Sequence, residues 1–180
     1  MGNYIGFDQA LMNTGVAIYQ PGAEPLVTLT TIKLVLENSV SNYHRLALLR
    51  RWLDYLVRKY EPVQVYTEAV YFNRITSYSM IPVEVQAVFK TQLYELGYES
   101  VPMNCGNQRD SWPNLTGLRL KSGAKRVLSQ YGITINQHES DAFGVLYGGL
   151  IRDGVLNKED IWKAKVIKKL IKNPTVPHLD

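Results

Sequence analysis

The sequence is poor in cysteine and contains no long apolar run. Cys105 is the single cysteine among 180 residues, so an internal disulfide and a cage of thiolate metal ligands are both excluded. The longest apolar stretch, Ala142–Ile151, is about half the ~20 residues that a membrane-spanning helix needs. No basic region followed by an apolar run opens the chain. We therefore expect no secretion, no membrane insertion and an intracellular, cytoplasmic location.

Charge of either sign is moderate, and its distribution is more informative than its total. The formal net charge is +4 and the pI is about 9.1, values that permit an anionic partner without requiring one. Basic side chains gather between Arg109 and Arg126, and again between Lys158 and Lys172. A hydrophobic fraction of 46% predicts a globular chain with one good core.

The first twenty residues predict a β-hairpin that carries an acid at its mouth. Asn3–Asp8 alternates into an apolar strand, the chain turns, and Thr14–Tyr19 reads as a second strand. Gly6 and Gly15 permit close approach of another backbone. A lone aspartate beside a turn more often bonds its own backbone, so Asp8 gains functional weight only if other carboxylates reach the same sheet edge.

The rest of the chain alternates strands and helices. We predict strands at Leu26–Leu36, Val63–Glu68 and Tyr98–Met103, and helices from Ser41 or Asn42 to Tyr60, from Pro82 to about Leu96, at Ser122–Tyr131, after His138, and at Lys158–Lys172. This order indicates an α/β fold with a five-stranded mixed sheet flanked by helices. Residues 1–155 would form the domain, and residues 156–180 a basic C-terminal helix and tail.

Acidic side chains recur where these elements end or begin. A strand reached through a helix is most simply parallel to the earlier strand, so Asp8 and Glu68 should leave the sheet at one edge. Two neighbouring carboxylates repel each other unless a cation lies between them. His138, Glu139 and Asp141 open the next core helix, and capping alone would explain only one acid there.

This ordered set of segments resembles the ribonuclease H-like fold and, within it, the RuvC family of Holliday junction resolvases. The matching segments, in chain order, are Ile5–Asp8 with Thr14 and Gly15, Glu68–Arg74, Gln86 in the second helix, Gly123–Val127, and His138–Ala142. The sequence departs from the family in two places. Gln9 and Ala10 replace its usual Pro-Gly, and His138 stands where bacterial members usually have an aspartate. The replacement of Pro-Gly suggests a divergent branch, such as a viral or phage member, acting in a bacterial cell or a phage-infected host.

The resemblance implies a metal site built from Asp8, Glu68 and Asp141. His138 is the fourth site residue in the family's order, and Glu139 is an alternative fourth ligand. Three carboxylates suit Mg²⁺, a hard ion for which Mn²⁺ can substitute. His138 would bind metal, position water or phosphate, or simply cap a helix. Lys125 matches the family's basic residue near the scissile phosphate, and its plain alternative is a solvated helix lysine.

The resemblance also implies contacts to branched DNA. Tyr71 falls where the family places an aromatic residue that stacks on opened bases, and its alternative is a buried anchor of its loop. The other residues expected to contact DNA are Phe72, Arg74, Arg119, Lys121 and Arg126.

The implied function is a metal-dependent, homodimeric endonuclease that resolves four-way junctions by paired nicks. The alternatives are a RuvC-like nuclease of relaxed specificity for flaps, forks and other branched DNA, or a non-catalytic junction-binding protein. An actin-like ATPase also begins with an Asp-bearing hairpin, but this chain lacks that fold's paired phosphate loops and the length for its two lobes.

Overall fold

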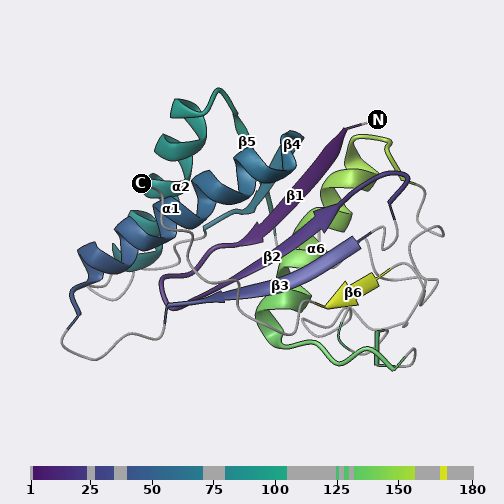
Figure 1. Cartoon of the computed structure of the whole chain (residues 1–180), viewed down its shortest axis with the longest axis horizontal. Helices are drawn as coiled ribbons and strands as arrows, with labels where there is room; N and C mark the ends of the chain where they lie inside the picture. The colour runs from purple at the N-terminus through teal and green to yellow at the C-terminus, as the bar shows by residue number, and fades with distance from the viewer. Residues whose placement is uncertain are drawn as a thin grey trace.

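A mixed, six-stranded sheet forms the centre of the molecule (Figure 1). The structure is a computed structural model that describes residues 2–23, 27–34, 40–70, 80–104, 125, 128–129 and 132–156, and the backbone of 167–169. The strand order is β5-β4-β1-β2-β3-β6. The strands are β1 (Asn3–Asp8), β2 (Asn13–Tyr19), β3 (Val27–Lys33), β4 (Pro62–Glu68), β5 (Ser100–Met103) and β6 (Ile167–Lys169).

All five predicted strands are present, and their directions match the crossover argument. β1 pairs antiparallel with β2 and parallel with β4. β6 is an addition that we did not predict, because Lys158–Lys172 reads as a helix. That prediction is wrong at Ile167–Lys169, which pairs with Val27–Leu29 of β3. Without β6, β3 would be an edge strand with a row of unpaired backbone groups, and their pairing outweighs local helix propensity.

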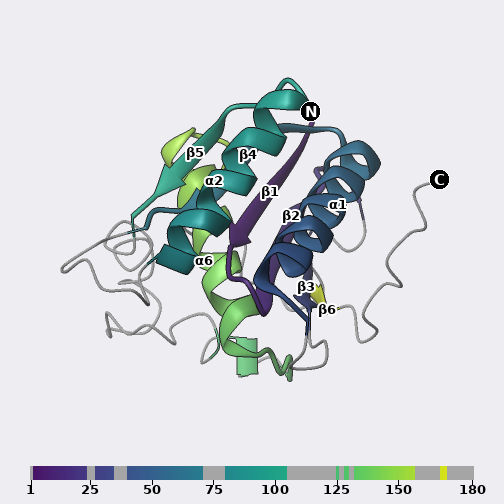
Figure 2. The same ribbon diagram turned by 90° about the vertical axis from the view of Figure 1, so that its left-hand side faces the viewer.

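Helices cover both faces of the sheet (Figures 1 and 2). α1 (Asn42–Tyr60) and α2 (Met80–Glu95) pack on one face, and α6 (Gln137–Arg152) packs on the other. Side chains alternate accordingly, so Ile5 and Phe7 of β1 join the core beneath α1 and α2. Tyr66 of β4 joins the core beneath α6. No helix among the described residues is long and apolar enough to cross a membrane.

The predicted boundaries of α1, α2 and the start of α6 hold to within about two residues. Ser41, one of the two predicted caps, accepts a hydrogen bond from the backbone N–H of His44 and begins α1. Glu61 ends α1 in the left-handed region at φ 41°. Arg50 of α1 then reaches Gln92 and Glu95 of α2, which ties the two helices together across their exposed edge.

Two glycines let α6 lie directly on the sheet. A Cβ added at Gly6 would lie 2.6 Å from the backbone nitrogen of Leu146, and one at Gly15 would lie 2.0 Å from the carbonyl oxygen of His138. The predicted close approach at these glycines is therefore confirmed. Contacts between backbones fix the height of α6 above β1 and β2 more rigidly than side-chain packing alone.

The predicted basic helix at Ser122–Tyr131 is described at three residues, Lys125, Leu128 and Ser129, and all three are helical. Leu128 is buried in the core beneath α6, and its carbonyl accepts a hydrogen bond from the backbone N–H of Ile133. Leu128 thus anchors this turn on the α6 face of the sheet, while the Lys125 side chain is exposed.

Candidate active site

Asp8 and Glu68 end two adjacent parallel strands on the same face of the sheet. β1 and β4 pair in a register that sets Gly6 opposite Tyr66 and Phe7 opposite Thr67. Because side chains alternate along a strand, Asp8 points to the same side as Gly6, and Glu68 to the same side as Tyr66. That side is the one covered by α6. Asp8 is buried and Glu68 is half-buried.

The first turn of α6 brings His138 onto Asp8. The carbonyl of His138 lies over Gly15, and Gly15 is the antiparallel partner of Asp8. From this position the Nδ1 atom of His138 lies 2.8 Å from Oδ2 of Asp8. An ionised carboxylate only accepts hydrogen bonds, so Nδ1 is the donor. In the neutral ring Nε2 is then the acceptor.

Asp141 lies one turn further along α6 and is held by a neighbour on its own helix. The Nε2 atom of Gln137 donates to both carboxylate oxygens of Asp141, at 2.8 Å and 3.0 Å. His138 and Asp141 are three residues apart, so they share one side of the helix. An amide and an acid four residues apart on a helix are a recognisable side-chain pair. We did not predict the pair formed by Gln137 and Asp141 from the sequence.

Glu139 has a structural task. Its backbone N–H donates to Oδ1 of Asn136 at 2.9 Å, and its carboxylate accepts from the backbone N–H of Asn136 at 2.9 Å. This reciprocal pair is a capping box at the start of α6. Glu139 is 2% exposed. The geometry therefore argues against Glu139 as the alternative fourth ligand, and the spacing of Asn136 and Glu139 was the signal for the cap.

The turn that follows β1 is held by hydrogen bonds to β2 and to β4. The hydroxyl of Thr14 donates to the carbonyl of Ala10 at 2.7 Å and accepts from its N–H at 3.3 Å. Gln9 reaches across to β4 and binds the backbone of Glu68 through both ends of its side-chain amide. Sequence reasoning missed Gln9, because a contact spanning 59 residues leaves no local pattern.

The donor atoms at this sheet edge suit a hard divalent cation. Carboxylate oxygens are the ligands that Mg²⁺ prefers, and Asp8, Glu68 and Asp141 supply them from two strand ends and one helix start. Among the described residues, no group of three or more His, Cys, Asp or Glu side chains is arranged to hold a metal ion. Asp8 and Asp141 are instead bonded to His138 and Gln137. The backbone placement and donor chemistry thus fit the ion, while the carboxylates do not yet converge on one point.

The described residues include few of those predicted to contact DNA. Tyr71, Phe72, Arg74, Arg119, Lys121 and Arg126 all lie outside the described residues. Lys125 is described and exposed on its helical turn. These residues remain predictions of the sequence.

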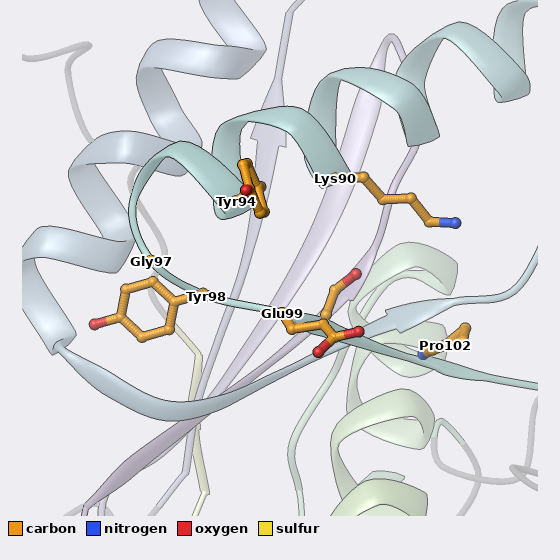
Figure 3. Close-up of a pocket in the computed structure, with 7 residues that line it drawn as sticks. Lys90, Tyr94, Gly97, Tyr98, Glu99 and Pro102 are labelled. Carbon is orange, nitrogen blue, oxygen red and sulfur yellow. The ribbon is translucent and has the colours of Figure 1, made fainter.

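A groove of about 750 Å³ opens elsewhere on the molecule. Figure 3 shows Lys90 and Tyr94 projecting from α2 above the segment that carries Tyr98, Glu99 and Pro102. Ser100 and Pro102 of β5 also line the groove, and they pair with Val65 and Thr67 of β4. Neither Asp8 nor Glu68 lines it, so the groove is distinct from the acidic site.

Comparison with solved structures identifies the fold. RuvC of Thermus thermophilus in complex with a Holliday junction substrate superimposes with a TM-score of 0.68, at 13% identity over 86% of this chain and 97% of that one. The chain has the fold of RuvC. A second Thermus thermophilus RuvC structure gives a TM-score of 0.63 at 13% identity over 84% and 96% of the two chains. The yeast mitochondrial Holliday junction resolvase Ydc2 gives 0.54 at 13% identity over 82% and 77%.

The likeness to RuvC is clear in the fold, while the overall sequence identity is low. No protein-family model and no curated protein matches this chain. At 13% identity the superposition establishes the fold alone. The predicted α/β, ribonuclease H-like architecture is confirmed by it, and the activity has to be argued from the residues at the sheet edge.

Proposed function

We propose that this chain is a metal-dependent endonuclease that resolves four-way DNA junctions by paired nicks. The observation that carries the proposal is the contact of Asp8, at the end of β1, with His138 at the start of α6, beside the parallel strand that ends at Glu68 in a RuvC-fold sheet. A RuvC of this fold is seen with a Holliday junction substrate, and Ydc2 is a Holliday junction resolvase. Both support a branched DNA substrate here. A homodimer would supply the two sites that cut opposing strands symmetrically.

Asp8, Glu68 and Asp141 are the residues that would hold Mg²⁺, or Mn²⁺ in its place. A bound ion would neutralise charge on the scissile phosphate and lower the pKa of bound water. To contribute, Asp141 has to share or exchange its hydrogen bonds with Gln137. The buried carboxylate of Asp8 would bind the ion while its Oδ2 contacts Nδ1 of His138.

His138 would orient the attacking water. Its Nδ1–H is bound by Asp8, which fixes the ring and makes Nε2 the hydrogen-bond acceptor. The His138 side chain is 36% exposed, so substrate and water can reach it. Lys125 would add a cation near the DNA backbone, where it stabilises charge that develops on the phosphate.

The direct test is cleavage of a synthetic four-way junction with Mg²⁺, beside a linear duplex of the same sequence. We expect paired, symmetric nicks in the junction, no nicks in the duplex, and no cleavage when the metal is chelated. Asp8→Asn should be inactive. Asp54→Asn is the matched control, because Asp54 lies on α1 and pairs with Arg58.

Two outcomes would replace the proposal with its alternatives. Equal cleavage of junctions, flaps and forks in competition would indicate a nuclease of relaxed specificity. Tight junction binding without cleavage in either Mg²⁺ or Mn²⁺ would indicate a non-catalytic junction-binding protein.

A further inference from the structure

The side chain of Gln9 continues the β1–β4 ladder by one step. The last backbone pair between these strands is Phe7 with Thr67. Beyond it, Nε2 of Gln9 donates to the carbonyl of Glu68, and the N–H of Glu68 donates to Oε1 of Gln9 at 3.0 Å. A side-chain amide has the same donor and acceptor as a peptide group. Gln9 therefore replaces the peptide that β1 no longer offers once its backbone turns away.

The other groups around this bridge are already fixed. On the Gln9 side, Ala10 is bonded at both its N–H and its carbonyl to the hydroxyl of Thr14. On the Glu68 side, the N–H of Ala69 donates to the carbonyl of Met103 at 2.9 Å, which ties the end of β4 to β5. The Gln9 amide is thus the link between two anchored strand ends that each carry an acid.

The bridge from Gln9 to the Glu68 backbone opposes the electrostatic repulsion between Asp8 and Glu68. Two carboxylates at neighbouring strand ends repel each other, and past the last ladder pair this repulsion would spread the strands. Two hydrogen bonds to one planar amide fix both the distance and the orientation of the Glu68 backbone relative to Gln9. Since Gln9 follows Asp8 directly in the chain, they also fix Glu68 relative to Asp8.

We propose that Gln9 is a positioning residue that presets the spacing of Asp8 and Glu68 for a shared divalent cation. The inference rests on the proposed function, since it needs the cation. Gln9 has no ligand role in it, because both ends of its amide are bonded to the Glu68 backbone. Partners that orient metal ligands typically change metal affinity by about 10–100-fold when they are removed.

The test is Mn²⁺ titration calorimetry on the whole chain without DNA, combined with thermal unfolding. Gln9→Met keeps the length and bulk of the side chain and removes both hydrogen bonds. Gln64→Met is the matched control on β4, the strand that carries Glu68, because Nε2 of Gln64 donates to the backbone carbonyls of Val65 at 3.2 Å and Glu99 at 3.0 Å, away from Asp8. Both variants should lose a few °C in Tm. Only Gln9→Met should bind Mn²⁺ about tenfold more weakly or worse.

The outcomes separate this inference from the proposed function. Wild-type chain that binds Mn²⁺, with equal affinity in Gln9→Met, would overturn the role of Gln9 and leave the metal site standing. Wild-type chain that does not bind Mn²⁺ would overturn the metal site and the role of Gln9 together. If Gln9→Met does not fold, Gln9→Asn decides the matter, because its amide is one methylene too short to bridge and the same weakening is expected.

Discussion

Adding one methyl group at Gly15 of β2, directly beneath the first turn of α6, should disable the site. The new Cβ would lie 2.0 Å from the carbonyl oxygen of His138 and 2.5 Å from its carbonyl carbon. Cβ atoms essentially never approach other heavy atoms more closely than 3.0 Å. The obstructing atoms are backbone, so no rotamer change relieves the contact. The start of α6 must rise by about 1 Å to accommodate Gly15→Ala.

The cost of this shift can be estimated for folding and for catalysis. Overpacking of this kind costs about 1–3 kcal/mol, which lowers the Tm of a chain of this size by about 2–12 °C. The contact between His138 and Asp8, now 2.8 Å long, lies directly in the displaced turn. A misplacement of about 1 Å at reacting groups costs about a hundredfold in rate. We therefore expect Gly15→Ala to be folded at 25 °C but about a hundredfold slower in junction cleavage.

Gly149→Ala is the control, because it disturbs the same helix at its other end. Its Cβ would lie 2.5 Å from the ring of Tyr66, so it should also lower Tm. The His138 end of α6 stays in place, and the cleavage rate well below Tm should be close to wild type. Single-turnover cleavage at 25 °C compares the two variants. If Gly15→Ala cleaves as fast as Gly149→Ala, the close docking of α6 does not set the site geometry.

Three further changes test charge at and around the site. Removing one carboxylate, in Asp8→Asn, Glu68→Gln or Asp141→Asn, should abolish cleavage. Junction binding measured by gel shift should stay intact or become slightly tighter, because less negative charge faces the DNA. Near-normal turnover in any of the three variants would remove that residue from the site. Lys125→Ala should slow single-turnover cleavage more than it weakens binding, and binding should fall steeply with added salt. The hydroxyl of Tyr66 donates a hydrogen bond to Asp153 at 2.7 Å. Burial of the Tyr66 side chain is the main cause that raises its pKa above the ordinary value of 10, and the hydrogen bond to Asp153 is the second. The stability from this group is present below about pH 10 and is lost above it, at up to about 1.4 kcal/mol per pH unit, so Tyr66→Phe should flatten the alkaline fall measured by urea unfolding.

The sequence predicts most of the fold because its hydrophobic periodicities are strong and its turn and capping residues clearly mark where elements end. The alternation of β1 and the helical spacing of α1 are each set by burial on one face. The parallel pairing of β1 with β4 followed from the helix between them. β6 was missed because three residues carry no pattern, and the open edge of β3 decides their conformation.

The site was predicted as a list of acids, and the structure changes the relation between them. Glu139 caps α6, which a reading of Asn136 and Glu139 as a capping box would have found. The contact of His138 with Asp8 spans 130 residues and depends on how closely α6 docks. Such a contact has no local signal, so the sequence predicted His138 as a site residue without its partner.

The apolar core decides whether these acids meet at all. Ile5, Phe7 and Val65 point to the α1 and α2 side of the sheet and are fully buried there. A slip of one residue between β1 and β4 would turn every side chain of one strand to the other face. Phe7 or Val65 would then lie under α6, and Asp8 or Glu68 would face the apolar core opposite. The burial of these apolar side chains opposes that slip, so the same residues that stabilise the sheet keep both carboxylates on the side where α6 presents His138 and Asp141.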